Sequence, residues 1–79
     1  MDFYELSKEI SILRKSKNIS QQTIAKDLNI SRATISNFES GSSSEIGLKK
    51  VLQIIDYLGY QIKLKEKSAF PIFEDVING

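Results

Sequence analysis

The stretch from residue 20 to 41, SQQTIAKDLNISRATISNFESG, constrains the fold most, because it indicates two short helices joined by a tight turn. Ser20 and Ser31 each occupy an N-cap position, where a hydroxyl accepts a hydrogen bond from a free amide of the first helical turn. Asn29 lies between them, and Asn tolerates the left-handed conformation of such a turn better than any residue except Gly. We therefore expect helices over about 21–28 and 32–39.

Apolar residues at helical spacing predict how these two helices pack against each other. Ala25 is small enough to lie where the helices cross steeply. The apolar set as a whole is Ile24, Ala25, Leu28, Ile30, Ile35 and Phe38. The second helix then turns a polar or small face outward, made of Arg32, Ala33, Ser36 and Asn37. A guanidinium fork, a methyl group, a hydroxyl and an amide suit base edges in a DNA major groove.

These residues together resemble the helix-turn-helix of the phage repressor (Cro/C1, or XRE) family. The matching positions are Ala25, Asn29, Ile30, Ile35, Phe38, Glu39 and Gly41, and the resemblance extends over roughly residues 10–59. Asn29 stands where the family usually has Gly, a change that the turn tolerates. The resemblance implies an all-α repressor-like fold and sequence-specific DNA binding. The alternative is an ordinary helical hairpin with a polar exposed face.

Composition narrows the function classes of this 79-residue chain. It contains no cysteine and no histidine, so thiolate and imidazole metal ligands and the usual proton shuttle are absent. We expect no enzyme activity, no metal, no cofactor, and a cytoplasmic location. Net charge is only +1, but basic residues gather on one side, over Arg14, Lys15, Lys17, Lys26 and Arg32. On charge alone, this basic side is more typical of a solvated charged surface than of a binding site, and it indicates DNA binding only because it overlaps the two short helices.

The flanking segments predict two further helices, giving a helical domain of four to five helices over residues 1–59. The first helix spans about 3–17, with Asp2 as its N-cap and an inward stripe of Phe3, Leu6, Ile10 and Leu13. The last spans about 48–58, begins after Gly47 and ends at Gly59. Its predicted inward residues are Leu48, Val51, Leu52, Ile55 and Leu58.

The period then changes from helical to alternating. Tyr60, Ile62 and Leu64 alternate with polar residues, which predicts one short C-terminal β-strand within residues 60–67. A single strand needs a partner, and the same strand of a second copy would supply one antiparallel across a dimer axis. Such a homodimer would bind a palindromic operator with half-sites about 34 Å apart. Alternatively, this segment is an extended tail or folds back on its own domain.

Within the repressor family, the sequence resembles the HipB-type antitoxins through ATISNFE at residues 33–39, Leu58-Gly59 and the strand that follows at once. This resemblance implies an autoregulating antitoxin of a type II toxin-antitoxin system that binds a HipA-like serine/threonine kinase toxin. It places base contacts at Ser31, Arg32 and Ala33, and backbone contacts at Gln21 and Thr34. We expect Gln22 to contact the DNA backbone as well. A stand-alone, phage-type repressor without a toxin partner is the alternative.

Two segments carry further candidate contacts. Ser42, Ser43 and Ser44 with Lys49 are similar to the loop that contacts the DNA backbone in this family, although a serine-rich run is also typical of a free linker. Residues 68–79 form a C-terminal tail in which Phe70, Ile72 and Phe73 surround the only proline. Apolar residues in a tail need a surface, and the three candidates are the domain's own core, the sister subunit and a partner protein.

Overall fold

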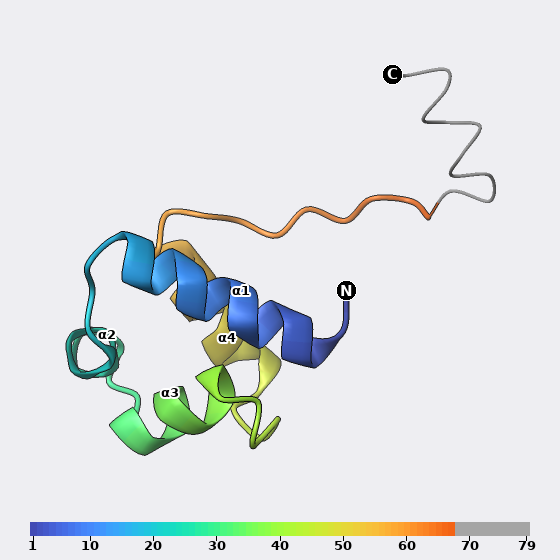
Figure 1. The fold of residues 1–79 in the computed structure, drawn as a ribbon. Coiled ribbons are helices and arrows are strands. Elements are labelled where there is room, and N and C mark those ends of the chain that lie inside the picture. The colour runs from blue at the N-terminus through green and yellow to red at the C-terminus, as the bar shows by residue number, and fades with distance from the viewer. Residues whose placement is uncertain (68–79) are drawn as a thin grey trace.

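A computed structural model describes residues 1–67 of the chain, and within that range it contains four helices. These are α1 (Phe3–Ser16), α2 (Gln21–Leu28), α3 (Arg32–Glu39) and α4 (Leu48–Tyr57). In Figure 1, α2 is seen end-on while α3 lies in the plane of the view, so the two cross steeply, with α1 and α4 stacked above α3. Helix α3 packs on α2 and α1, and α4 packs on α2.

The predicted N-caps are confirmed. The side chains of Asp2, Ser20 and Ser31 accept hydrogen bonds from the backbone amides of Glu5, Thr23 and Thr34 at 2.8, 3.0 and 3.1 Å. Helix α4 has Gly47 before it and no side-chain cap, as expected from a residue without a side chain. Three of the four helix starts are therefore fixed by local hydrogen bonds that the sequence encodes directly.

All four helices end in the same way, with one residue of positive φ and two backbone hydrogen bonds that close the last turn. These residues are Asn18, Asn29, Gly41 and Gly59. After α2, for example, the amide of Asn29 donates to the carbonyl of Lys26 and that of Ile30 to the carbonyl of Ala25, at 3.2 and 2.9 Å. This is a Schellman motif, and it turns the chain sharply. The prediction for Asn29 and Gly59 is confirmed.

Eleven buried apolar side chains form a single core that draws on every helix and on two connecting segments. They are Ile10, Ile24, Ala25, Ile30, Ile35, Phe38, Ile46, Val51, Ile54, Ile55 and Leu58. Ala25 is buried where α2 meets its neighbours, as its size predicted. Phe3 is only partly covered, and its ring meets that of Phe38 edge to face at a centroid distance of 5.4 Å.

The predicted inward face of α4 is wrong in part. Leu48 and Leu52 are 70% and 44% exposed, whereas Ile54, which was not selected, is 2% exposed. At about 100° per residue, the buried residues of α4 define a face from which Leu48 and Leu52 are turned by roughly 70° and 110°. The body of the domain covers only part of the helix's wide apolar arc. These two leucines therefore remain on the surface.

Residues 60–67 have no helix or strand assignment in the single chain, so the predicted strand is not formed there. The segment leaves the end of α4 and runs back in the direction of the N-terminal end of α1 (Figure 1). At its start, the ammonium group of Lys17 lies over the ring of Tyr60 at 5.6 Å from the centroid. Phe70, Ile72 and Phe73 lie outside the described residues.

Gly41→Ala is expected to destabilise the domain by about 1–3 kcal/mol. A Cβ at this position would lie 2.5 Å from Cδ1 of Tyr4, and φ is +76°. Gly47→Ala is the matched control, because φ there is +86° but nothing lies within 4 Å of the added Cβ. Urea unfolding of both variants separates the steric cost from the backbone cost. Equal destabilisation of the two would show that Tyr4 moves aside freely.

Candidate nucleic-acid interface

The outer face of α3 is formed by side chains that the core leaves free. Ile35 and Phe38 are 1% exposed and fix the inner face. The five residues predicted to contact bases, Ser31, Arg32, Ala33, Ser36 and Asn37, are all exposed. Ser31 also caps the helix, so its hydroxyl has a structural role besides any contact that it makes with DNA. The fold thus presents this helix face to solvent as one surface, as the sequence predicted.

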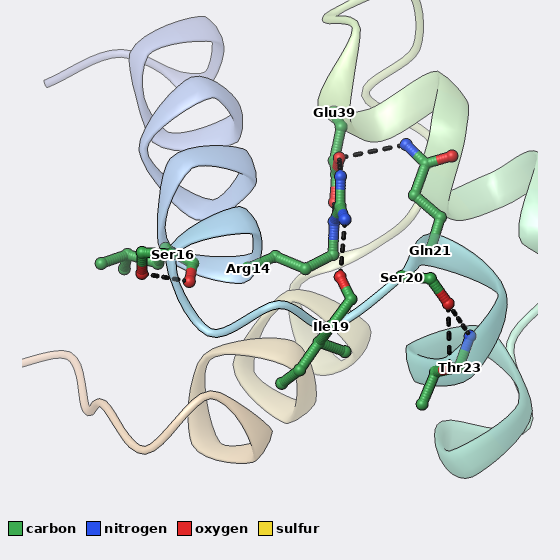
Figure 2. A network of polar contacts seen from close by, with 8 residues as sticks. Arg14, Ser16, Ile19, Ser20, Gln21, Thr23 and Glu39 are labelled. Carbon is green, nitrogen blue, oxygen red and sulfur yellow. Dashed lines mark hydrogen bonds and ion pairs between the residues drawn. The ribbon is translucent and has the colours of Figure 1, made fainter.

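An ion pair behind this surface fixes the end of α3 to α1 (Figure 2). Nε and Nη2 of Arg14 donate to Oε2 and Oε1 of Glu39 at 2.7 and 2.8 Å. The two side chains are only 8% and 6% exposed. Nη1 of Arg14 donates to the carbonyl of Ile19 at 2.7 Å, in the connection between α1 and α2. One guanidinium group therefore joins α1, the next connection and the end of α3.

Gln21 completes this network from the first turn of α2. Its Nε2 donates to Oε1 of Glu39 at 3.1 Å, as Figure 2 shows. The predicted role of Gln21 was a DNA backbone contact, and its amide nitrogen here binds inside the protein. Gln22 beside it is exposed. The angle between α2 and α3 is thus held by polar contacts as well as by the core.

Arg14 does not belong to the basic side of the chain, so its prediction as an exposed cation there is wrong. Arg14 is 7% exposed and forms an ion pair with Glu39. Lys15, Lys17, Lys26 and Arg32 are exposed and remain as the basic side. A buried ion pair over 25 residues of sequence separation has no local signal. Only the joint presence of an arginine in one helix and a glutamate in another hints at it.

Glu39 has a lowered pKa because of this network. Burial by itself would raise the pKa of the carboxyl group, but the hydrogen bonds from Arg14 and Gln21 and the positive charge of Arg14 outweigh it. A carboxyl group with a lowered pKa in the folded state stabilises the fold above its ordinary pKa. That contribution is lost as the pH falls through the lowered value.

The free energy of unfolding of the native chain is therefore expected to fall more steeply with acidification than that of Glu39→Gln. The difference should develop below about pH 4.5, the ordinary range of a glutamate, because the variant has no carboxyl group to protonate at this site. Urea unfolding between about pH 3 and pH 7 measures both slopes. Parallel curves would mean that Glu39 has the same pKa in the folded and unfolded chains.

The serine loop after α3 folds back onto the helix end. The carbonyl of Asn37 accepts hydrogen bonds from the amides of Ser42 and Ser43 at 3.1 and 3.3 Å, and from the hydroxyl of Ser42 at 3.3 Å. These contacts exclude a free linker at Ser42 and Ser43. Ser44 is exposed. The loop therefore has a defined position beside α3.

A small polar cleft lies between α3, this loop and α4. Its lining consists of Thr34, Asn37, Ser43, Glu45, Ile46 and Lys50. Lys50 and Glu45 were not selected from the sequence, where nothing distinguishes them from other charged residues. Lys49, which was selected, lines a different groove on the outer side of α4. The lysine beside α3 in this part of the chain is thus Lys50, one position after the predicted Lys49.

Two short helices joined by a left-handed turn, with one buried and one exposed face on the second, define a helix-turn-helix unit. The family model described as Helix-turn-helix matches residues 10–64. The chain therefore belongs to the helix-turn-helix family, of the XRE type. Membership of this family supports the function of a DNA-binding transcription regulator. The comparison with curated proteins gave no match. Within residues 1–67, no helix is long and apolar enough to cross a membrane.

Proposed function

We propose that the chain is a repressor that inserts α3 into the major groove of a palindromic operator. The observation that carries this proposal is the exposure of Arg32, Ser36 and Asn37 on a helix whose other face is fully buried. Arg32 reads bases, with Ser31 and Ala33 at the same end of the helix. Phosphates on either side are contacted by Gln22, Thr34 and the serine loop, Ser42 to Ser44. Lys50, in the cleft beside α3, also contacts a phosphate, and Lys49 makes a weaker phosphate contact from the outer side of α4.

We propose further that two copies pair through residues 60–65. Tyr60 and Ile62 are each 46% exposed in the single chain and Leu64 is 98% exposed. Antiparallel pairing with a second copy would bury this alternating apolar face and satisfy the backbone groups of the segment. The two-fold axis would also place two α3 helices on one side of the dimer, about 34 Å apart on DNA.

Leu64→Asp is expected to weaken this dimer at least about tenfold, because each subunit loses a buried leucine worth about 1.5–3 kcal/mol. The side chain is 98% exposed in the single chain, so the helical domain itself should keep its stability. Gln61→Ser, on the other side of the segment, is the control. Sedimentation equilibrium measures the dissociation constant. An unchanged constant in Leu64→Asp would place the dimer contact elsewhere.

The third part of the proposal is that this repressor is a HipB-type antitoxin. Its support is the sequence resemblance in residues 33–39 and 58–65, together with the helix-turn-helix fold that such antitoxins need. The partner would be a HipA-like serine/threonine kinase toxin, and the complex would repress its own operon. Phe70, Ile72 and Phe73, outside the described residues, are candidate contacts for the kinase.

Co-purification from the native cell tests this part, with operator DNA present and absent. The full chain is compared with the variant Phe70→Ser, Ile72→Ser, Phe73→Ser. Recovery of a serine/threonine kinase whose activity falls when the chain is added would support the antitoxin. If no kinase is recovered while the chain still binds DNA, the stand-alone repressor is the correct function.

A further inference from the structure

A shallow groove runs along the outer side of α4. It is lined by Leu48, Lys49, Leu52, Gln53 and Asp56, which recur at the spacing of one helix face. The opposite face of α4 is in the core, through Val51, Ile54 and Ile55. Leu48 and Leu52 lie on adjacent turns of α4, and both side chains are exposed to water. Of the residues that line the α4 groove, only Lys49 belongs to the DNA-binding surface proposed above.

We propose that the C-terminal tail of the same chain occupies the α4 groove. The tail segment FPIFED, residues 70–75, contains three large apolar side chains followed by two acidic ones. The groove offers apolar surface at Leu48 and Leu52 and one ammonium group, that of Lys49, while its one carboxylate, Asp56, lies two turns further along α4. Lys49 takes part in no ion pair within residues 1–67. Phe70, Ile72 and Phe73 would cover the leucines, and Glu74 and Asp75 would meet Lys49.

The length of the tail allows this arrangement. Gly59 reverses the chain at the end of α4, and residues 60–67 run back from there (Figure 1). Residues 60–69, which link Gly59 to the apolar part of the tail, span up to about 33 Å when extended, which is more than the 24 × 18 Å cross-section of the molecule. The exposed face of α4 from Leu48 to Asp56 is about 12 Å long at 1.5 Å per residue. Residues 70–75 are thus long enough to cover it.

The covalent link also favours the tail over a free partner. A segment tethered by a few residues has an effective concentration in the millimolar range, so a weak apolar contact suffices to keep it bound. A second copy of the chain has no such advantage at this groove. A protein partner that binds the tail would have to displace it from α4. The proposal does not depend on the DNA-binding function.

A spin label tests the proposal in the full chain. The chain has no cysteine, so Val76→Cys gives one attachment site for a nitroxide directly after the acidic pair. In ¹⁵N-labelled protein, we expect the label to broaden the amide signals of Leu48, Lys49 and Leu52 strongly. The signals of Ser36 and Asn37, on the outer face of α3, should broaden less. Uniform or absent broadening along α4 would overturn the proposal.

A mixing experiment distinguishes a tail that binds the α4 groove of its own chain from a tail that binds the groove of a second copy. Protein that carries ¹⁵N but no spin label is mixed with an equal amount of protein that carries the spin label but no ¹⁵N. Broadening of the α4 signals in this mixture would assign the groove to the tail of a second copy and contradict the proposal. Sharp α4 signals in the mixture, with broadening in the directly labelled chain, would support it.

Two sets of variants test the chemistry of the contact. Leu48→Gln with Leu52→Gln changes only exposed side chains and is expected to abolish the broadening while the fold is kept. Lys49→Glu should reduce the broadening, and the further changes Glu74→Lys and Asp75→Lys should restore it. Full broadening in the glutamine variant would show that the tail does not occupy the α4 groove.

Discussion

Arg14→Ala is expected to destabilise the domain by about 3–5 kcal/mol, the typical cost of leaving one member of a buried ion pair without its partner. The variant leaves the carboxylate of Glu39 at 6% exposure, with the amide of Gln21 and the hydroxyl of Ser11 as its remaining polar contacts from other helices. It also frees the carbonyl of Ile19. Small domains have a total stability of about 5 kcal/mol or little more, so a large part of the variant should be unfolded at 25 °C.

Thermal and urea unfolding followed by circular dichroism measure this effect. Lys15→Ala is the matched control, because it removes an exposed cation from the neighbouring position of the same helix. The double variant Arg14→Met, Glu39→Met should recover part of the loss, since two apolar side chains of similar length leave no unpaired charge. An Arg14→Ala chain as stable as Lys15→Ala would show that the ion pair contributes nothing to the fold.

Local signals were the part of this fold that the sequence made predictable. Each predicted N-cap and the turn at Asn29 depend on a few adjacent residues, and the structure has them where they were expected. The same holds for the outer face of α3, since burying Ile35 and Phe38 on one side of a helix leaves the other side to solvent. Capping and helical periodicity need no knowledge of the rest of the chain.

Long-range choices were not predictable from the pattern. Helix α4 has apolar residues around almost half of its circumference, and periodicity alone cannot say which part of that arc meets the core. Leu48 and Leu52 were therefore placed inward, although α4 turns Ile54 into the core and leaves both leucines exposed. The network of Arg14, Glu39 and Gln21 has the same origin, because its three members come from three different helices.

The same difference between local and long-range signals is seen at the candidate nucleic-acid interface. The exposed side chains on the outer face of α3 were identified from the sequence, whereas the contacts that hold α3 in place were not. Arg14 was taken for a surface cation, and Gln21 for a residue free to meet a phosphate. Both residues bind Glu39 and so hold α3 in place from behind its outer face. Loss of DNA binding in variants of these two residues would therefore follow from a change in helix position.

Arg32→Ala is expected to weaken operator binding by about 1–3 kcal/mol and to remove the preference at one base pair. The side chain lies in the first turn of α3, is exposed, and makes no hydrogen bond or ion pair within the described part of the chain. Its guanidinium group is thus available for a bidentate contact, which O6 and N7 of a guanine suit best. Removing it should leave the fold intact, since no core contact is lost.

Competition binding against operators substituted at each base pair distinguishes readout from simple attraction. A base contact predicts that Arg32→Ala loses affinity for the native operator and discriminates less at one position of each half-site. Lys26→Ala provides the comparison, because it removes an exposed cation from α2 and should weaken all sequences alike and reduce the salt dependence. If Arg32→Ala behaves like Lys26→Ala, Arg32 contacts a phosphate and the bases are read by Ser36 and Asn37.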